Sequence, residues 1–351
     1  MWQRIIEARL TRNPFLFIIW LLLIPFSFVY GACMALRNLF YDIGIFHMHR
    51  SKALVVSIGN IAVGGTGKTP LTLKLCQEFS IDVKVAVLSR GYKALAERLP
   101  KPILVHAKTL PATCGDEPYL VAKNARDADV IVGKSRVDGA KFAESLGADL
   151  IFLDDGMQHR KLARDFNVVL LDPKNFLDSL FPAGRLRERK NALKRADLIV
   201  LNPVFDEKEF FRAKHCVQAP LVGVQPKAEA FLGDKSISLQ GKSAYLFCGI
   251  ANPKRFFKSV ANLGAQVCGS HFIEDHGKFS LKALQNIAEK AKALGAEMLV
   301  CTEKDFVKYP KDISLSLPIV WLSLDLDVAF GVEEWKLFLG RVREKLRSRV
   351  Y

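Results

Sequence analysis

The run Val63-Gly64-Gly65-Thr66-Gly67-Lys68-Thr69 follows an apolar stretch at 54–58 and precedes a segment that can form a helix. Glycines let successive backbone N–H groups face one anion, Lys68 would bridge two phosphates, and the Thr69 hydroxyl would ligate Mg²⁺. Ala62 stands where the full pattern has its first glycine, so a glycine-rich turn with a solvated lysine is the alternative. The run predicts a nucleoside-triphosphate site contacted by Ala62, Val63, Gly64, Gly65, Thr66, Gly67, Lys68 and Thr69.

Two adjacent carboxylates, Asp154 and Asp155, end the apolar run 148–153. In an open parallel sheet, ligands bind at the carboxyl ends of the strands, and paired acids beside a phosphate loop suit a hard cation. An Asp-Gly turn that caps a helix is the structural alternative. Gln158 and His159 follow at once, and this clustering favours contact with substrate.

A third acidic residue, Asp116, lies in the turn 114–118 ahead of a helical segment. Transfer of a phosphoryl group to an alcohol needs a carboxylate within hydrogen-bond reach of the hydroxyl, and Asp116 suits that role. The same position also suits a helix N-cap, and spacing does not choose between the two.

Basic residues recur in the loops predicted at the same sheet edge, namely Arg90, Lys134, Arg136, Arg185, Arg187 and Arg189. Guanidinium groups are preferred partners of phosphate oxygens, although about half of this set would be ordinary solvated surface. Glu188 stands among three of the arginines, so it is either an ion-pair partner or a metal ligand. Further along, Asp275 and His276 form a pair that can orient an imidazole for proton transfer, while a capped helix beside a structural histidine is the commoner arrangement.

Apolar runs alternate with helical stretches along most of the chain. The expected strands cover 54–58, 83–89, 103–105, 130–132, 150–153, 168–171, 198–201, 244–248, 267–273, 298–301 and 319–324. Their continuous hydrophobicity is typical of parallel strands buried on both faces, which predicts an α/β fold with a phosphate-loop core. We expect an anchor at 1–40, a kinase core at 41–225 and a smaller α/β lobe at 226–351, with a crossover or linker at about 218–241.

The segment from Asn13 to Leu36 carries no charged side chain. About 20 apolar residues suffice to cross a bilayer as a helix, whereas secretory signals have shorter apolar regions, so an uncleaved membrane anchor is favoured over a signal peptide. Arginines flank both ends almost evenly, so orientation does not follow from charge. Nucleotide binding requires the catalytic part to face the cytoplasm, and a helix embedded in one leaflet would satisfy the pattern equally well.

A net charge of +15 over 351 residues indicates an anionic partner, which could be nucleic acid, a phosphorylated substrate or a membrane surface. No basic motif interleaved with aromatics appears, so we do not expect nucleic acid. Seven cysteines are scattered singly, which argues against zinc and disulfide frameworks and for a reducing compartment.

Several of these motifs together resemble one family, the tetraacyldisaccharide 4'-kinases, or lipid A 4'-kinases. The residues that carry the resemblance are 59–70, 88–92, 115–118, 154–159, 182–188 and 302–305. The family does not require the first glycine of the loop. The resemblance implies a bacterial inner-membrane enzyme that uses ATP and Mg²⁺ to phosphorylate the 4'-hydroxyl of tetraacyldisaccharide 1-phosphate, forming lipid IVA during lipopolysaccharide assembly.

The resemblance also implies roles for individual residues. Asp116 resembles the catalytic base and His276 its partner, and Gly277 stands where the family often has a second histidine. By motif, Lys68 and Thr69 handle phosphates and metal, Asp154, Asp155 and Glu188 surround Mg²⁺, and Arg136, Gln158, His159 and Arg187 lie near substrate or phosphate. A membrane-tethered nucleotide switch or ATPase is the alternative function, because phosphate loops serve such proteins too.

Overall fold

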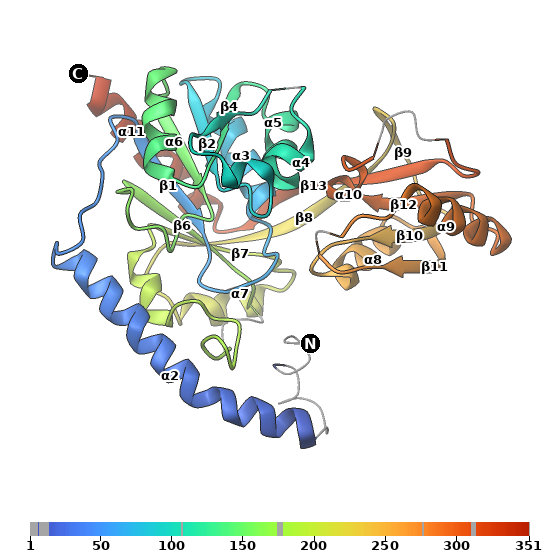
Figure 1. The fold of residues 1–351 in the computed structure, drawn as a ribbon, viewed down its shortest axis with the longest axis horizontal. Coiled ribbons are helices and arrows are strands. Elements are labelled where there is room, and N and C mark those ends of the chain that lie inside the picture. Colours follow the sequence, from blue (N-terminus) through green and yellow to red (C-terminus); the bar gives the residue numbers. More distant parts are fainter. Residues whose placement is uncertain are drawn as a thin grey trace.

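The computed structural model describes residue 6 and the ranges 14–106, 108–173, 178–275, 277–309 and 314–350. Its first half contains α2 (Pro14–Asp42), β1 (Leu54–Gly59), α3 (Lys68–Phe79), β2 (Val85–Ser89), η2 (Leu95–Arg98), β3 (Ile103–Leu104), α4 (Pro111–Cys114), α5 (Asp116–Asn124), β4 (Ala128–Val132), α6 (Arg136–Ser145), β5 (Leu150–Asp154) and β6 (Phe166–Leu171). Its second half contains η4 (Lys190–Arg195), β7 (Leu198–Leu201), α7 (Glu207–Lys214), β8 (Leu221–Leu232), β9 (Lys235–Ile237), β10 (Ser243–Cys248), α8 (Pro253–Asn262), β11 (Gln266–Phe272), α9 (Leu281–Ala293), β12 (Met298–Thr302), α10 (Glu303–Phe306), β13 (Ile319–Phe330) and α11 (Val332–Val350). Figure 1 shows these elements in two lobes.

The larger lobe is built on the parallel strands β7-β6-β1-β5-β2-β4, with β3 antiparallel at the edge. Every residue of β1, β5 and β7 is buried, which explains why their sequences are continuously apolar. Ile58 pairs with Asp154 in the register of β1 and β5, so the phosphate loop and the acidic pair leave the sheet at the same edge. The predicted α/β fold is confirmed.

Helices close both faces of this sheet. Leu75 of α3 and Phe338 of α11 share one buried cluster with β1 and β5. Ala140 of α6 packs on the opposite face, beside the β1 residue Val55. Burying each large apolar side chain contributes about 1.5–3 kcal/mol. The edge that carries the loops is therefore held on a rigid platform.

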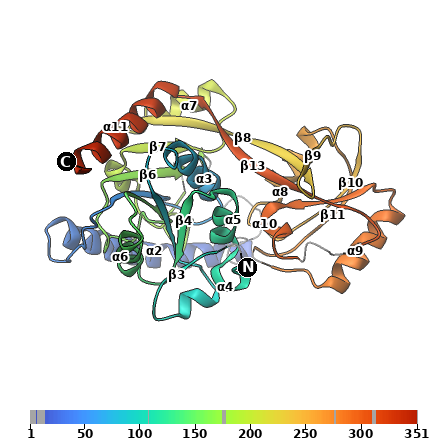
Figure 2. The same ribbon diagram turned by 90° about the horizontal axis from the view of Figure 1, so that it is seen from above.

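The smaller lobe continues the same sheet through β13, β12, β10 and β11. The long strands β8 and β13 pair antiparallel and run from one lobe to the other, as both ribbon views show (Figures 1 and 2). The stretch expected as a linker at about 218–241 thus forms β8 and β9, and the expected boundary at 225/226 falls inside β8. The outer half of β8 is only partly buried, so it lacks the continuous apolar pattern that marked the other strands.

Helix α2 lies along the larger lobe (Figure 1) and is the one described helix that is long and apolar enough to cross a membrane. Phe15, Leu22 and Phe26 are 69%, 64% and 64% exposed. Ser27 is buried on the opposite side, where its hydroxyl donates to the Leu180 carbonyl at 3.0 Å. An apolar helix near the N-terminus is weak evidence of membrane association, and residues 1–5 and 7–13 of the expected anchor lie outside the described ranges.

Candidate active site

The phosphate loop joins β1 to α3, which begins at Lys68. Gly67 precedes the helix with φ +91°, and a Cβ added there would lie 2.3 Å from the Asn202 side-chain nitrogen. Asn202 donates to the Thr66 carbonyl at 2.7 Å, and Asn60 donates to the Thr66 hydroxyl at 3.0 Å. The first N–H groups of a helix have no partner within it, so the curled loop and the start of α3 form an anion site.

Two residues expected to contact phosphate have their N–H groups occupied elsewhere. The Ala62 N–H donates to Asn60 Oδ1 at 2.8 Å, and the Val63 N–H donates to the Arg185 carbonyl at 2.8 Å. These two N–H groups are thus engaged within the protein, whereas Val63 and residues 64–69 line the cleft. Ala62 replaces the first glycine of the full phosphate-loop pattern. It is buried and does not line the cleft, so its methyl group does not obstruct a bound anion.

Asp155 connects the loop lysine to an arginine. Lys68 Nζ lies 3.4 Å from Asp155 Oδ1, and Arg187 Nη1 lies 2.9 Å from Asp155 Oδ2. Burial raises the pKa of Asp155, but the charges and hydrogen bonds of Lys68 and Arg187 outweigh it, so the pKa lies below its usual value. Asp155 is therefore an ionised carboxylate beside the phosphate loop.

Asp154 ends β5 and is buried. The Ser89 hydroxyl donates to Asp154 Oδ2 at 3.2 Å, whereas the buried Oδ1 has no hydrogen-bond partner among the described residues. Burial, followed by the nearby charge of Glu117, raises the pKa of Asp154 to about 6. A buried carboxylate oxygen without a donor is what a divalent cation would satisfy.

Within the described ranges, no three His, Cys, Asp or Glu side chains gather closely enough to hold a metal ion by themselves. Phosphate-loop enzymes commonly hold Mg²⁺ with one hydroxyl, one acidic residue and the phosphates of the nucleotide. Thr69 at the start of α3 and the free oxygen of Asp154 fit that smaller set of protein ligands.

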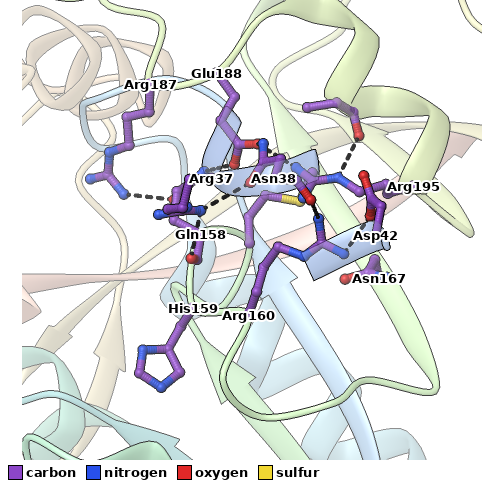
Figure 3. A network of polar contacts seen from close by, with 12 residues as sticks. Arg37, Asn38, Asp42, Gln158, His159, Arg160, Asn167, Arg187, Glu188 and Arg195 are labelled. Atoms are coloured by element: carbon purple, nitrogen blue, oxygen red, sulfur yellow. Dashed lines mark hydrogen bonds and ion pairs between the residues drawn. The ribbon is translucent and has the colours of Figure 1, made fainter. Parts of the chain in front are cut away.

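Glu188 lies in a different network, shown in Figure 3. Its buried carboxylate accepts hydrogen bonds from Asn38 Nδ2 at 2.8 Å and Gln158 Nε2 at 3.0 Å, and it forms an ion pair with Arg195. Both oxygens are thus engaged by donors, and we leave Glu188 out of the metal ligands that we propose. Of its two predicted roles, ion-pair partner is the one the contacts support.

The same network ties α2 to the site. Arg37 donates to the Gln158 carbonyl at 3.0 Å, and the Tyr30 hydroxyl donates to the Arg187 carbonyl at 3.0 Å. Gln158 Oε1 in turn accepts from Arg187 Nη1 at 3.3 Å. His159 points away from this cluster (Figure 3). Burial and then the surrounding cations, Arg136 first, lower the pKa of His159 to about 4, so its ring is neutral at physiological pH.

Arg136 is the first residue of α6, and its side chain is buried. Its guanidinium donates to the Gly133 carbonyl at 3.1 Å and to the Asp154 carbonyl at 3.4 Å, while Nε is buried without a partner among the described residues. Burial is the main cause that lowers the pKa of Arg136. Arg136 thus holds the end of β5 that carries the acidic pair.

Asp116 is the first residue of α5, and the N-cap position is taken by Gly115, whose φ is +98°. Asp116 Oδ2 lies 3.6 Å from Lys308 Nζ, which comes from the smaller lobe. His276, its expected partner, lies outside the described residues.

One cleft of about 2210 Å³ brings most of these groups together. Its lining includes Lys68, Asp116, Asp154, Asp155, Arg136, Gln158, His159 and Arg187 from the larger lobe, Arg255 and Lys304 from the smaller lobe, and Arg37 and Tyr41 from α2. Sequence reasoning missed Asn60, Ser89 and Asn202 as supports of the site. Each is a polar residue at the end of a parallel strand, and that position was the available indication.

Comparisons with known proteins agree with this geometry. The family model "LpxK: Tetraacyldisaccharide-1-P 4'-kinase" matches residues 19–344. The tetraacyldisaccharide 4'-kinase of Syntrophus aciditrophicus is 35% identical over 345 residues, covering 91% of each chain, and that of Desulfotalea psychrophila is 34% identical over 302 residues, covering 81% of this chain and 86% of the relative. The "apo" form of LpxK from Aquifex aeolicus, crystallised in complex with ATP, has a TM-score of 0.71 at 28% identity, covering 91% of this chain and 98% of that one. The chain therefore belongs to the LpxK family of tetraacyldisaccharide-1-P 4'-kinases.

Proposed function

We propose that this protein uses ATP to phosphorylate the 4'-hydroxyl of tetraacyldisaccharide 1-phosphate, forming lipid IVA. Family membership supplies the substrate class. The observation that carries the proposal is the ion pair between Lys68 and Asp155, which places the phosphate loop directly beside the acidic pair. Such a site serves phosphoryl transfer by positioning its reactants and by neutralising their charge.

The nucleotide would bind with its phosphates against the N–H groups of residues 64–69 and the Lys68 ammonium group. Thr69 and Asp154 would hold Mg²⁺ together with the phosphates, and Asp155 would stand close by, paired with Lys68 and Arg187. Mg²⁺ supplies positive charge that offsets the charge on the transferring phosphoryl group. Arg187, which pairs with the same Asp155 carboxylate as Lys68, would also contact phosphate.

Asp116 would accept the proton of the acceptor hydroxyl. As that oxygen forms its bond to the γ-phosphorus, the bond between the γ-phosphorus and the bridging oxygen breaks and ADP leaves. Asp116 lines the same cleft as Lys68 and Asp155, which supports this role. His276 stays a proposed partner of Asp116 on the resemblance alone.

The acceptor would approach from the side of α2. Arg37 and Tyr41 of this helix line the cleft, and its exposed side is apolar. A lipid with a phosphorylated sugar needs both an apolar surface and cations. We place the protein at the cytoplasmic face of the bacterial inner membrane, with α2 embedded in the bilayer surface.

The test is an acceptor-dependent kinase assay. Purified protein is mixed with ATP labelled in the γ-phosphate, Mg²⁺ and tetraacyldisaccharide 1-phosphate in detergent micelles. Labelled bisphosphorylated lipid, absent without acceptor and absent with Lys68→Ala, is expected. ATP hydrolysis at the same rate with and without acceptor, and no labelled lipid, would overturn the proposal in favour of an ATPase or nucleotide switch.

A further inference from the structure

Lys308 is a buried cation in the smaller lobe, with 5% of its side chain exposed. Its ammonium group contacts three oxygen atoms: Asp305 Oδ1 at 2.9 Å, the Gly277 carbonyl oxygen at 2.9 Å and Asp116 Oδ2 at 3.6 Å. The first two belong to the smaller lobe, whereas Asp116 begins α5 in the larger lobe. Lys308 thus carries a positive charge across the cleft to the residue that we propose as the base.

The Asp305 carboxylate that anchors Lys308 is itself fixed. It is 1% exposed, its two oxygens lie 3.2 and 3.1 Å from the Gly249 nitrogen, which donates to them, and the Thr302 hydroxyl donates to Oδ2 at 2.7 Å. A buried charge is tolerated only when partners hold it, and Asp305 has three: the Gly249 N–H, the Thr302 hydroxyl and the Lys308 ammonium group. The Lys308 head group is therefore held by a rigid acceptor.

Other titratable groups also lie near Asp116. Lys304 Nζ lies 3.2 Å from Glu117 Oε1 and 3.4 Å from Asp275 Oδ1, so it balances both carboxylates. The Cys114 thiol has its pKa raised to about 11, chiefly by burial, and is uncharged. Lys304 also interacts electrostatically with Asp116, so this carboxylate has two cations near it, and Lys308 forms an ion pair with it at 3.6 Å.

We propose that Lys308 is a positioning residue for the phosphoryl transfer, and this inference rests on the proposed function of Asp116. Its ammonium group holds the Asp116 carboxylate in its ionised form and ties it to the segment at Gly277. The base is complete only when the smaller lobe lies against α5. The acceptor proton moves to Asp116.

The test compares variants at Lys308 in full-length protein. Lys308→Met keeps the length of the side chain and removes the charge, Lys308→Arg keeps the charge, and Lys123→Met is the matched control. Lys123 also bridges the lobes, through Glu303 at 2.9 Å, so its variant weakens a contact between lobes without touching Asp116. Turnover, KM for ATP and the pH dependence of kcat/KM for the lipid are measured for each.

For Lys308→Met we expect turnover to fall by about 30-fold or more, with KM for ATP nearly unchanged. We also expect the acid limb of the pH profile to move upward by about 1 pH unit, because a neighbouring cation lowers the pKa of a carboxyl group. Lys308→Arg should recover much of the rate, and Lys123→Met should leave the acid limb in place. Unchanged turnover and an unchanged acid limb in Lys308→Met would overturn the inference.

Lys308→Met leaves Asp305 without its cation, so a second variant covers the case of a folding defect. Asp305→Asn combined with Lys308→Met removes both charges, and binding of a fluorescent ATP analogue reports an intact larger lobe. This double variant should show the same upward shift of the acid limb. If wild-type protein forms no labelled lipid, the proposed function fails. If wild-type protein is active and the acid limb of the variants stays in place, only the role of Lys308 is refuted.

Discussion

The Lys68 ammonium group, at the end of the phosphate loop, forms an ion pair with the Asp155 carboxylate, with 3.4 Å between Nζ and Oδ1. Because Arg187 holds the other Asp155 oxygen at 2.9 Å, Asp155 lies between two cations that a triphosphate would also contact. The ion pair therefore fixes the position of the Lys68 ammonium group beside Asp155. A bound nucleotide would share Lys68 with Asp155 and would find it already oriented.

Replacing Lys68 by alanine should lower kcat/KM for ATP by about 100-fold or more, since the loop loses the charge that faces the phosphates. Steady-state kinetics with saturating lipid measure this. Lys74→Ala changes another lysine of α3 and should stay near wild type. Equal rates for wild type and Lys68→Ala would contradict the assignment of the loop.

Replacing Asp116 by alanine or asparagine should lower turnover by about 100-fold, because no carboxylate remains to take the hydroxyl proton. Affinity for ATP should change little, since Asp116 is not among the residues that we propose to hold the phosphates. Single-turnover kinetics and nucleotide titration separate the two effects. The exposed Asp127→Asn serves as control. A near-normal single-turnover rate would remove Asp116 from the proposed mechanism.

The strands and the loop could be predicted because their determinants are local. The continuous apolar pattern of β1 and β5 reflects burial on both faces, and the glycine-lysine-threonine order follows from the geometry of phosphate binding. Asp154 and Asp155 could be placed beside the loop because parallel strands end at a common edge. These inferences needed only neighbours in sequence and one rule of topology.

The partners of Glu188 could not be predicted, because Asn38 comes from α2 and Arg195 from η4, and no periodic pattern connects them. The same holds for Lys308, which meets Asp116 because the lobes are joined by the pairing of β8 with β13 and by contacts between α5 and α10. The sequence predicts a linker where β8 forms, because Pro220, Pro226 and three glycines interrupt its pattern and the outer half of the strand is only partly buried. Local pattern identifies elements, whereas contacts between lobes depend on the whole fold.

Replacing Gly67 by alanine should abolish ATP binding. The new Cβ would lie 2.3 Å from the Asn202 side-chain nitrogen in a backbone with φ +91°, so the loop must shift. Gly147→Ala is a matched control, because φ is +83° there and nothing lies within 4 Å of the added Cβ. Calorimetric titration with ATP should give no measurable binding for Gly67→Ala and wild-type affinity for Gly147→Ala. Wild-type affinity in both would show that the loop tolerates a side chain.

The buried carboxyl of Asp154 predicts a pH-dependent cost to stability in metal-free protein. Its pKa is about 6 in the fold and about 3.9 in the unfolded chain, so the native state keeps the proton to higher pH. Stability is therefore lost as pH rises from about 4 to about 6. In EDTA, Asp154→Asn should match wild type near pH 4 and exceed it by about 3 kcal/mol near pH 7.5 in urea unfolding. A difference that is the same at both pH values would contradict the raised pKa.

The exposed apolar side of α2 should determine binding to membranes. Phe15, Leu22 and Phe26 are mostly exposed, while Ser27 on the other side is hydrogen-bonded to the larger lobe, so the helix would bind in the plane of the bilayer surface. Changing the three apolar residues to serine should reduce co-sedimentation with anionic vesicles by about 10-fold or more, since each loses roughly 1.5–3 kcal/mol of burial. Ile81→Ser is the matched control, because Ile81 is 89% exposed on the body of the larger lobe. If the control weakens binding as much as the triple variant does, the attachment is nonspecific. If neither variant weakens it, α2 is not the membrane-binding element.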